Sequence, residues 1–515
     1  MLRRLKSPYV AVTLIFACLY TAMFGIMPMM FDDVWFRYYL QPFLHEPSWA
    51  NLWEGLIENH RVCAVEDNVR IPNTIMPLLV IFTNRIPAVL NGVCVGLSLW
   101  LGAEVTGVWR KSPLGFSLWI VGFTLLLPWA DHMFGVAFAT NYVPLTALTL
   151  TVCLLFLRDR TSPWLLLFIS FLTGMWHEAG IATLLGCVTA VALFFKKYRN
   201  KQAASIAAGC LAALSVYFMA PATAAKLGDS APTLRSFFAF SFNIIYGIWY
   251  FIYLLAMIFC FSIKSVRTKL FNPAVMLCAG GATAGWIVFR LFPYTDHTAW
   301  PMLVFVALGA VCIVKATVPA NRIAIAIAII ITTACTVQSA LCLPWFARLR
   351  HEQEYAVALA EANPGKSGLF APMTLPAEQP LYLFGHPNFN SLMKYGYPVT
   401  RVVPERLRDF SPEKAEAIGL DGTEAYLYNG LIVLPDQPLE QVHWNCLVEY
   451  DGKDILPSYC IRSYFTNDAG TFVHVRPYQP LRKSAMSTVT GFRLDTDNLR
   501  IDPYECLYEI DYIRN

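Results

Sequence analysis

The fold class is decided near the amino terminus by residues 3–33, which read RRLKSPYVAVTLIFACLYTAMFGIMPMMFDD. A short basic segment leads into an apolar run over residues 8–30, and an acidic pair, Asp32-Asp33, follows. Roughly 17–25 apolar residues are needed to cross a hydrocarbon core of about 30 Å. A basic start can also mark a signal peptide, but no small-residue cleavage site precedes Phe31. Residues 8–30 are therefore predicted to form a first transmembrane helix.

The same alternation of apolar run and polar break recurs over the first two thirds of the chain. The sequence is 56% hydrophobic and only 14% charged, whereas soluble domains carry about 25% charged residues. We therefore expect a polytopic α-helical membrane protein with about eleven transmembrane helices. The predicted spans are 8–30, 86–106, 113–130, 141–157, 164–181, 180–195, 203–220, 237–262, 272–290, 300–316 and 321–343.

The charge pattern predicts the orientation of these helices. Every second loop is basic, and basic loops face the cytoplasm in most membrane proteins. The amino terminus is then cytoplasmic, the first outer loop is long (residues 31–85), and everything after residue 344 is extracytoplasmic. Residues 72–83 are apolar but too short to span, so we expect an interfacial or re-entrant helix there. The basic loops contain Arg3-Arg4-Lys6, Arg110-Lys111, Arg158-Arg160, Lys196-Lys197-Arg199-Lys201, Lys264-Arg267-Lys269 and Lys315-Arg322.

The composition changes after the last apolar run, which predicts a transmembrane domain over residues 1–343 and an extracytoplasmic α+β domain over 344–515. Residues 348–361 have the pattern of an exposed helix. Short β-prone runs separated by turn residues then indicate a β-rich region. A disulfide among Cys446, Cys460 and Cys506 stays open, because an odd count leaves the pairing undecided. The β-prone runs are 381–384, 425–434, 442–450, 458–465, 471–476, 491–494 and 506–513.

Several classes of function find no support in the sequence. The net charge of +4 gives no reason to expect a nucleic-acid partner. There is no Walker loop, GxGxxG, HExxH or CxxC motif. The two halves of the membrane region do not match as an inverted repeat, which weighs against a secondary transporter.

The acidic pair Asp32-Asp33 is the first candidate for chemistry. Two adjacent carboxylates at a membrane boundary repel one another, which favours proton uptake by one of them and suits a general base. The alternative is a polar flank that simply ends the first helix.

A second group of candidates pairs acidic residues with histidines at the predicted outer ends of helices. His177 and Glu178 lie in a tight turn, where such residues are costly unless they line a wet cavity. They can bind a divalent cation such as Mg²⁺ or Mn²⁺, accept hydrogen bonds from sugar hydroxyls, or stabilise a base. Two neighbouring residues do not make a metal site, so other groups would have to converge on them. The further members of this group are Asp131, His132, Asp296, His297 and, just inside a span, Asn141.

Cations on the outer side form a third group, because the positive-inside rule depletes them there. Arginine presents a planar fork that matches a phosphate with two hydrogen bonds. Arg61 and Arg290 are the first choices for binding a phosphate, and contact with lipid head groups is the alternative. The full set is Arg37, Arg61, Arg70, Arg85, Lys226, Arg235 and Arg290.

The layout as a whole resembles the GT-C superfamily of membrane glycosyltransferases, and most closely multi-pass bacterial members. The motifs that carry the resemblance are short: Phe31-Asp32-Asp33, Asn59-His60-Arg61 and Trp176-His177-Glu178. Such enzymes take a sugar from a polyprenyl-phosphate donor in the membrane and transfer it to a glycan, lipid or protein acceptor outside the cytoplasm. The resemblance implies that an acidic residue of the first outer loop, here Asp32 or Asp33, acts as base or orients the acceptor.

The reaction expected from this resemblance is inverting glycosyl transfer in the inner membrane of a bacterium. Asp33 or Asp32 would deprotonate the acceptor, while Arg290 and Arg61 would bind the phosphate. His177 and Glu178 would shape a sugar or metal site. Two rival functions stay open: a transporter or flippase of lipid-linked saccharide, and a non-catalytic membrane scaffold whose outer domain binds a partner.

Overall fold

The computed structural model describes most of the chain as two compact units, and each unit is considered by itself. The first comprises Met1–Gly25, Pro42–Trp129 and Val136–Leu341, and the second comprises Ile26–Gln41, Ala130–Gly135 and Cys342–Asn515. The described residues are 8–29, 32–66, 68–109, 111–129, 134–159, 161–223, 244–291, 296–373, 401–436, 443–452, 454–477 and 489–495.

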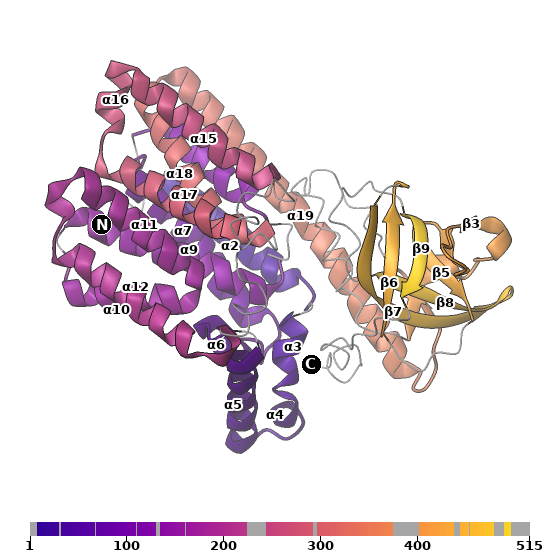
Figure 1. The fold of residues 1–515 in the computed structure, drawn as a ribbon. Coiled ribbons are helices and arrows are strands. Elements are labelled where there is room, and N and C mark those ends of the chain that lie inside the picture. The colour runs from indigo at the N-terminus through magenta and orange to yellow at the C-terminus, as the bar shows by residue number, and fades with distance from the viewer. Residues whose placement is uncertain are drawn as a thin grey trace. The chain divides into compact units, whose positions relative to one another are not determined.

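The first unit is helical throughout its described residues (Figure 1). Apolar runs form these helices because a helix satisfies every backbone polar group internally, as a hydrocarbon surrounding requires. The helices are α2 (Pro8–Ile26), α4 (Gln41–His45), α5 (Trp49–Glu66), α6 (Ile71–Leu79), α7 (Arg85–Thr106), α8 (Pro113–Val121) with the π-helical η1 (Gly122–Leu126), α9 (Val136–Arg158), α10 (Pro163–Trp176), α11 (Glu178–Phe194), α12 (Lys201–Met219), α15 (Ile244–Ser262), α16 (Lys264–Leu270), α17 (Pro273–Leu291), α18 (Trp300–Thr317) and α19 (Arg322–Ala362).

Several of these helices are long and apolar enough to cross a membrane, which supports an integral membrane protein. Within the described residues there are seven, or eight if the bent pair of α15 and α16 is one span. The prediction of about eleven spans was therefore too high. The predicted spans 113–130, 164–181 and 180–195 are helical but form the shorter helices α8–η1, α10 and α11. Pro163 begins α10 and the extended backbone of His177 ends it, which leaves 14 residues.

Glycines let α11 and α17 approach closely. A Cβ atom on Gly186 would lie 2.6 Å from the carbonyl oxygen of Gly280, and one on Gly280 would overlap the carbonyl oxygen of Gly186. Ala190 and Ala284 continue this small-residue contact. In lipid the hydrophobic effect does not drive helices together. Small residues let two helices approach closely, and the van der Waals contact that they gain stabilises the pair.

The segment between α2 and α7 contains only short or polar helices among its described residues. The apolar stretch predicted to be too short to span forms α6, whose nine residues include Pro72 and Pro77. The preceding helix α5 is mixed in polarity, so its ordering depends on contacts with its neighbours.

The second unit contains α3 (Asp32–Tyr38), the latter part of α19 and a strand-containing region. Residues 348–361 are helical as predicted, but they continue the last apolar run through Pro344 in a single helix of 41 residues. The strands are β1 (Leu369–Ala371), β2 (Val402–Pro404), β3 (Glu416–Ala417), β4 (Tyr426–Tyr428), β5 (Leu431–Pro435), β6 (His443–Tyr450), β7 (Asp454–Asn467), β8 (Gly470–Pro477) and β9 (Val489–Asp495).

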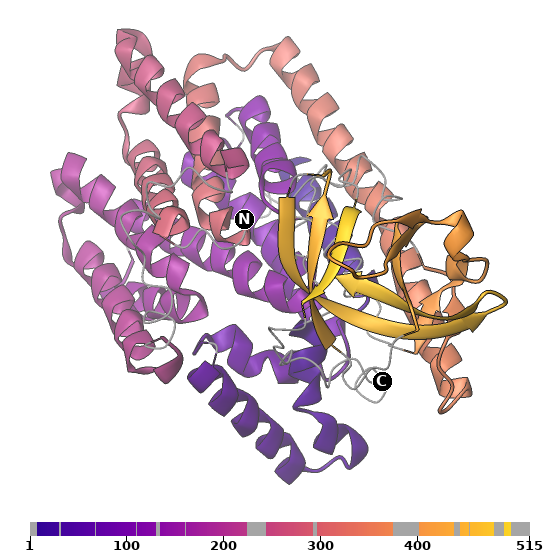
Figure 2. The same ribbon diagram turned by 45° about the vertical axis from the view of Figure 1, so that its right-hand side comes forward.

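The strands form a strongly curved sheet, shown in gold in Figure 2. Its order is β3-β4-β5-β8-β7-β6-β9 and its neighbours pair antiparallel, while β1 and β2 form a separate parallel pair. Asn429-Gly430 connects β4 to β5, and both residues have positive φ, as a two-residue hairpin turn requires. The predicted runs 425–434, 442–450, 458–465, 471–476 and 491–494 fall on β4 to β9, whereas 381–384 and 506–513 lie outside the described residues.

Consecutive apolar residues along β5 explain why apolar clusters cover both faces of the sheet. Ile432 and Leu434 belong to one buried cluster with Val448, Val475 and Phe492. Val433 belongs to another, which includes Phe410 and Phe472. Successive side chains of a strand point to opposite faces, so β5 has apolar contacts on each side. Cys446 is buried in the first cluster, and Cys506 lies outside the described residues, so the disulfide hypothesis stays open.

Candidate functional site

Asp32 and Asp33 form the first turn of α3 in the second unit. Asp33 is only 1% exposed, and Asp32 is half-buried. Carboxylates in the first turn of a helix interact favourably with its dipole, which accounts in part for their position. Arg37 lies one turn further along α3, is 2% exposed, and donates from Nη1 to the sulfur of Met29 at 3.5 Å.

A polar site in the first unit is built around an ion pair between Arg70 and Glu178. Arg70 precedes α6, and Glu178 is the first residue of α11. Arg70 Nε donates to Glu178 Oε2 at 2.8 Å, and Arg70 Nη2 donates to Oε1. The side chains are 18% and 46% exposed, so the pair lies at the edge of the packed helices. This two-bond geometry is the strong form of an arginine–carboxylate contact.

His177 lies in the turn between α10 and α11, outside the seven candidate spans. Its Nδ1 accepts a hydrogen bond from the backbone N–H of Ala179 at 3.1 Å and so caps α11. The ring is 5% exposed, and burial, followed by the charge of Arg70, lowers the pKa of His177 to about 3. The imidazole is therefore neutral near pH 7, and its proton is assigned to Nε2 because Nδ1 accepts the capping bond.

This protonation state decides two neighbouring contacts. His177 Nδ1 is 3.5 Å from Glu178 Oε2, but a neutral imidazole does not form an ion pair. His177 Nε2–H is buried and has no hydrogen-bond partner within the described residues. A buried donor without a partner is costly, so this position suits a ligand or water that accepts a hydrogen bond.

Burial alone would raise the pKa of Glu178. The charge of Arg70 and the hydrogen bonds that it donates outweigh that effect and hold the pKa of Glu178 well below its usual range. Glu178 is therefore an ionised acceptor, and its exposed fraction leaves room for a further donor.

Aromatic and amide side chains surround the histidine. The ring of Tyr142 lies 4.7 Å from that of His177 and 5.5 Å from that of His297. Asn141 donates to Asn73 Oδ1 at 3.1 Å, and Asn59 donates to the carbonyl oxygen of Asn73 at 2.9 Å. These bonds join α5, α6 and α9, so the segment that carries Arg70 is fixed against the helices next to the turn.

The structure therefore brings four of the predicted site residues into one group: His177, Glu178, Asn141 and His297. Arg70, Tyr142 and Asn73 complete this group, although the sequence did not make them first choices for the site. Arg70 already stood out as an outer cation, but nothing in the sequence showed which carboxylate it would meet. Tyr142 and Asn73 gave no signal, since aromatic and amide residues are common at helix ends.

The remaining predicted residues lie elsewhere or are not described. Arg61 is exposed on α5 and its Nε donates to Glu58 Oε2 at 2.8 Å, so its fork contacts a neighbour on the same helix. Arg290 is in the last turn of α17, and Asp296 begins the short helix η3 (Asp296–Ala299). Asp131 and His132 lie outside the described residues.

No group of three or more His, Cys, Asp or Glu side chains within the described ranges is arranged to bind a metal ion. The charge of Glu178 is instead balanced by Arg70. The site thus offers a neutral donor, an ionised acceptor and an aromatic ring with little net charge, which suits a hydroxyl-rich ligand better than a phosphate.

Comparison with known proteins does not assign this chain to a family: no family model, curated protein or solved structure matches it. The resemblance to the GT-C superfamily therefore stays a prediction. Function has to be argued from the chemistry of the sites.

Proposed function

We propose that the protein is a membrane glycosyltransferase that moves a sugar from a polyprenyl-phosphate donor to an extracytoplasmic acceptor, with Asp33 as the general base. The observation that carries the proposal is the position of Asp33. It is 1% exposed, lies beside a second carboxylate, and begins a helix soon after the first apolar helix. A buried carboxylate is expensive to maintain and is retained where its charge has a use.

The proposed step is a single displacement. The Asp33 carboxylate takes the proton of the acceptor hydroxyl, and the acceptor oxygen attacks the anomeric carbon of the donor sugar. A new carbon–oxygen bond forms as the bond to the phosphate oxygen breaks, and polyprenyl phosphate leaves with the electron pair. The anomeric configuration is inverted. Proton transfer of this kind contributes about 10²–10⁴-fold to the rate.

The polar site of the first unit, around His177, is considered by itself and is proposed to bind a sugar. In this proposal His177 Nε2–H donates to a sugar oxygen, Glu178 accepts from a sugar hydroxyl, and Tyr142 supplies an aromatic face. Arg70 orients Glu178 through its two hydrogen bonds and is a positioning residue. Arg290 stays a predicted ligand of the donor phosphate, and the fork of Arg61 contacts Glu58.

The experiment measures transfer of labelled sugar in membranes that contain the protein and a panel of polyprenyl-phosphate sugars. Asp33→Asn keeps the size of the side chain and removes its charge, and it should lower transfer at least about 100-fold. Glu58→Gln, which removes an exposed carboxylate from α5, should leave transfer within about twofold. Unchanged transfer in Asp33→Asn would refute the assignment of the base.

A second measurement distinguishes the proposed glycosyltransferase from a transporter of lipid-linked saccharide. A transporter would carry lipid-linked sugar across a reconstituted bilayer and transfer none of it to an acceptor from any donor of the panel. That result would exclude the proposed reaction.

A further inference from the structure

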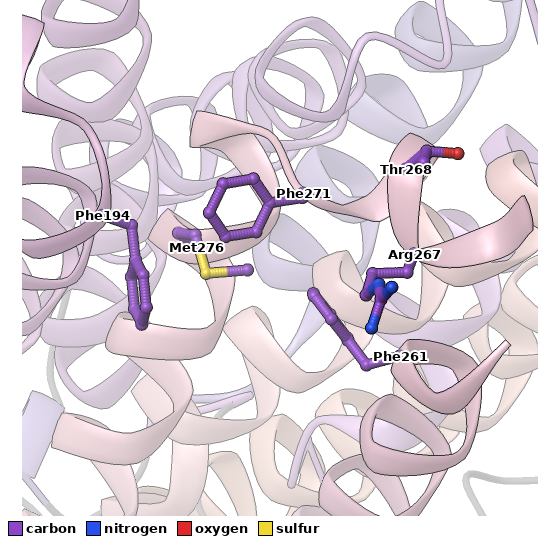
Figure 3. Close-up of a pocket in the computed structure, with 6 residues that line it drawn as sticks. All are labelled: Phe194, Phe261, Arg267, Thr268, Phe271 and Met276. Carbon is purple, nitrogen blue, oxygen red and sulfur yellow. The ribbon is translucent and has the colours of Figure 1, made fainter. Parts of the chain in front are cut away.

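The first unit contains an open groove at the end of α11 that is remote from the turn of His177. It has a volume of about 780 Å³ and is lined by Phe194, Phe261, Arg267, Thr268, Phe271 and Met276 (Figure 3). Its size is within the range of about 300–1,000 Å³ typical of small-molecule pockets. His177 precedes the first residue of α11 and Phe194 is its last, so the helix separates the two sites by about 24 Å at 1.5 Å per residue.

A sharp bend in the chain creates the groove. The axes of α15 and α16 differ by 117°, and the break falls at Ile263, whose backbone is extended. The chain leaves α16 through Phe271 and enters α17 at Pro273. The ring of Phe271 packs 5.3 Å from that of Phe195 and stands edge-on to Phe194 at 6.1 Å, which forms one wall.

The groove is apolar along most of its length and charged at one end. Three aromatic rings and Met276 line it, and Arg267 lies on the α16 side (Figure 3). The helix that carries Arg267 reads KSVRTKL, with three basic residues and no acidic one. This combination matches a molecule with a hydrocarbon chain and an anionic head.

Three neighbouring cations already have partners, whereas the guanidinium of Arg267 has none among the residues that the structure describes. Lys269 donates to the carbonyl oxygen of Ala316 at 3.2 Å, and Lys197 pairs with Asp159 at 3.1 Å. Arg199 donates to the carbonyl oxygen of Ala192 at 2.7 Å. Within the described part of the chain, no hydrogen bond or ion pair involves the Arg267 guanidinium. Its fork is therefore available to bind a phosphate with two hydrogen bonds.

The surroundings favour a membrane lipid as the source of that phosphate. The apolar face of α15 leads to the groove and exposes large side chains, including Leu255 at 66%, Ile258 at 60% and Phe259 at 67%. Such a surface is stable only against hydrocarbon. The basic loops at this end mark the side where anionic lipids attract Lys and Arg.

We propose that the groove is a specific site for an anionic phospholipid of the leaflet next to the basic loops, which the charge pattern predicts to be cytoplasmic. One acyl chain lies against Phe194, Phe261, Phe271 and Met276. The phosphate is bound by Arg267. The site is independent of the proposed sugar transfer, because none of its residues belongs to that machinery.

The test uses the full-length protein in nanodiscs of phosphatidylcholine with a minor fraction of phosphatidylglycerol, and counts retained phosphatidylglycerol by native mass spectrometry. Arg267→Gln should lower its retention about tenfold, as expected for the loss of charge-assisted hydrogen bonds, and Arg267→Lys should restore it in part. Lys264→Gln is the matched control: it removes one charge from the same helix but does not line the groove. An equal loss in Lys264→Gln would reduce the effect to general surface charge and overturn the proposal.

A second pair of variants tests the acyl chain. Phe194→Ala removes one wall of the groove and should lower retention, whereas Leu193→Ala, at the exposed position next to it, should not. Thermal unfolding of each variant shows whether it is folded. Wild-type retention of phosphatidylglycerol in a folded Arg267→Gln variant, or equal retention of phosphatidylcholine by the wild type, would refute the site.

Discussion

Arg70 and Glu178 are 108 residues apart in the chain, yet they meet through two parallel hydrogen bonds. The contact ties the segment before α6 to the turn that begins α11. That turn also carries His177, whose capped and neutral state depends on the same environment. A contact between two residues that are far apart in the sequence therefore determines the local chemistry of the polar site.

The first prediction concerns the coupling of this pair. Arg70→Ala or Glu178→Gln alone leaves a partly buried charge without its partner and should lower the free energy of unfolding by about 1–3 kcal/mol, between the values for surface and buried pairs. The double variant should cost less than the sum of the two. Thermal unfolding in detergent measures this cycle, and strictly additive losses would show that the pair does not couple.

The second prediction concerns pH. The pKa of His177 in the folded protein is about 3, below its ordinary value of 6.5, so the unfolded chain binds a proton that the folded protein does not. Stability should fall as pH drops from about 6.5 toward 3, by up to about 1.4 kcal/mol per pH unit. Glu178 acts in the same direction below pH 4.5, because its lowered pKa gives stability that is present above its unfolded value and lost in acid.

The variant that checks this effect is His177→Gln, which should flatten the dependence of stability on pH between 7 and 5. His45→Gln, which removes an exposed histidine from the end of α4, is the control. Equal slopes in the wild type and His177→Gln would show that His177 does not titrate as described.

The third prediction concerns the contact of α11 with α17. Gly280→Ala places a methyl group against the backbone of Gly186 and should destabilise the protein by about 1–3 kcal/mol, the usual cost of overpacking. Gly247→Ala is the control, because a Cβ there meets only Phe289, at 3.9 Å. Equal melting temperatures for the two variants would contradict the close packing.

The fourth prediction concerns orientation. Every second loop is basic, which predicts that these loops face the cytoplasm and that the last segment lies outside it. A reporter that is active only outside the cytoplasm should therefore work when fused after Asn515. A fusion after Lys201 should be inactive with that reporter and active with one that requires the cytoplasm. Activity of the Asn515 fusion only in the cytoplasm would reverse the predicted topology.

The sequence was sufficient to predict the long apolar helices and the strands β4 to β9, because apolar periodicity and turn residues act locally. The run 425–434, for example, contains β4, the Asn429-Gly430 turn and β5. The number of spans was overestimated because composition does not show where a helix ends. His177 ends α10 by its backbone conformation, within a stretch that is apolar apart from His177 and Glu178.

The site was only partly predictable, because some of its signals are local in the sequence and others depend on the fold. His177 and Glu178 stand out locally as polar residues in an apolar stretch. The partner of Glu178 cannot be found locally, since several outer arginines were equally good candidates and only the fold brings Arg70 to it. The pairing of Arg61 with Glu58, by contrast, follows from their spacing of three residues on one helix and was overlooked.

The shortness of α10 has a consequence for the lipid around the protein. Its 14 residues extend about 21 Å, against a hydrocarbon thickness of about 30 Å. Its face is exposed at Trp164 and Phe168, by 79% and 61%. A helix this short does not reach across an unthinned bilayer, so α10 can span only where the lipid beside it thins, at a cost of fractions of a kcal/mol per Å of mismatch. Bilayers of shorter-chain lipids should therefore favour a membrane-spanning α10, and thick, sterol-rich bilayers should oppose it.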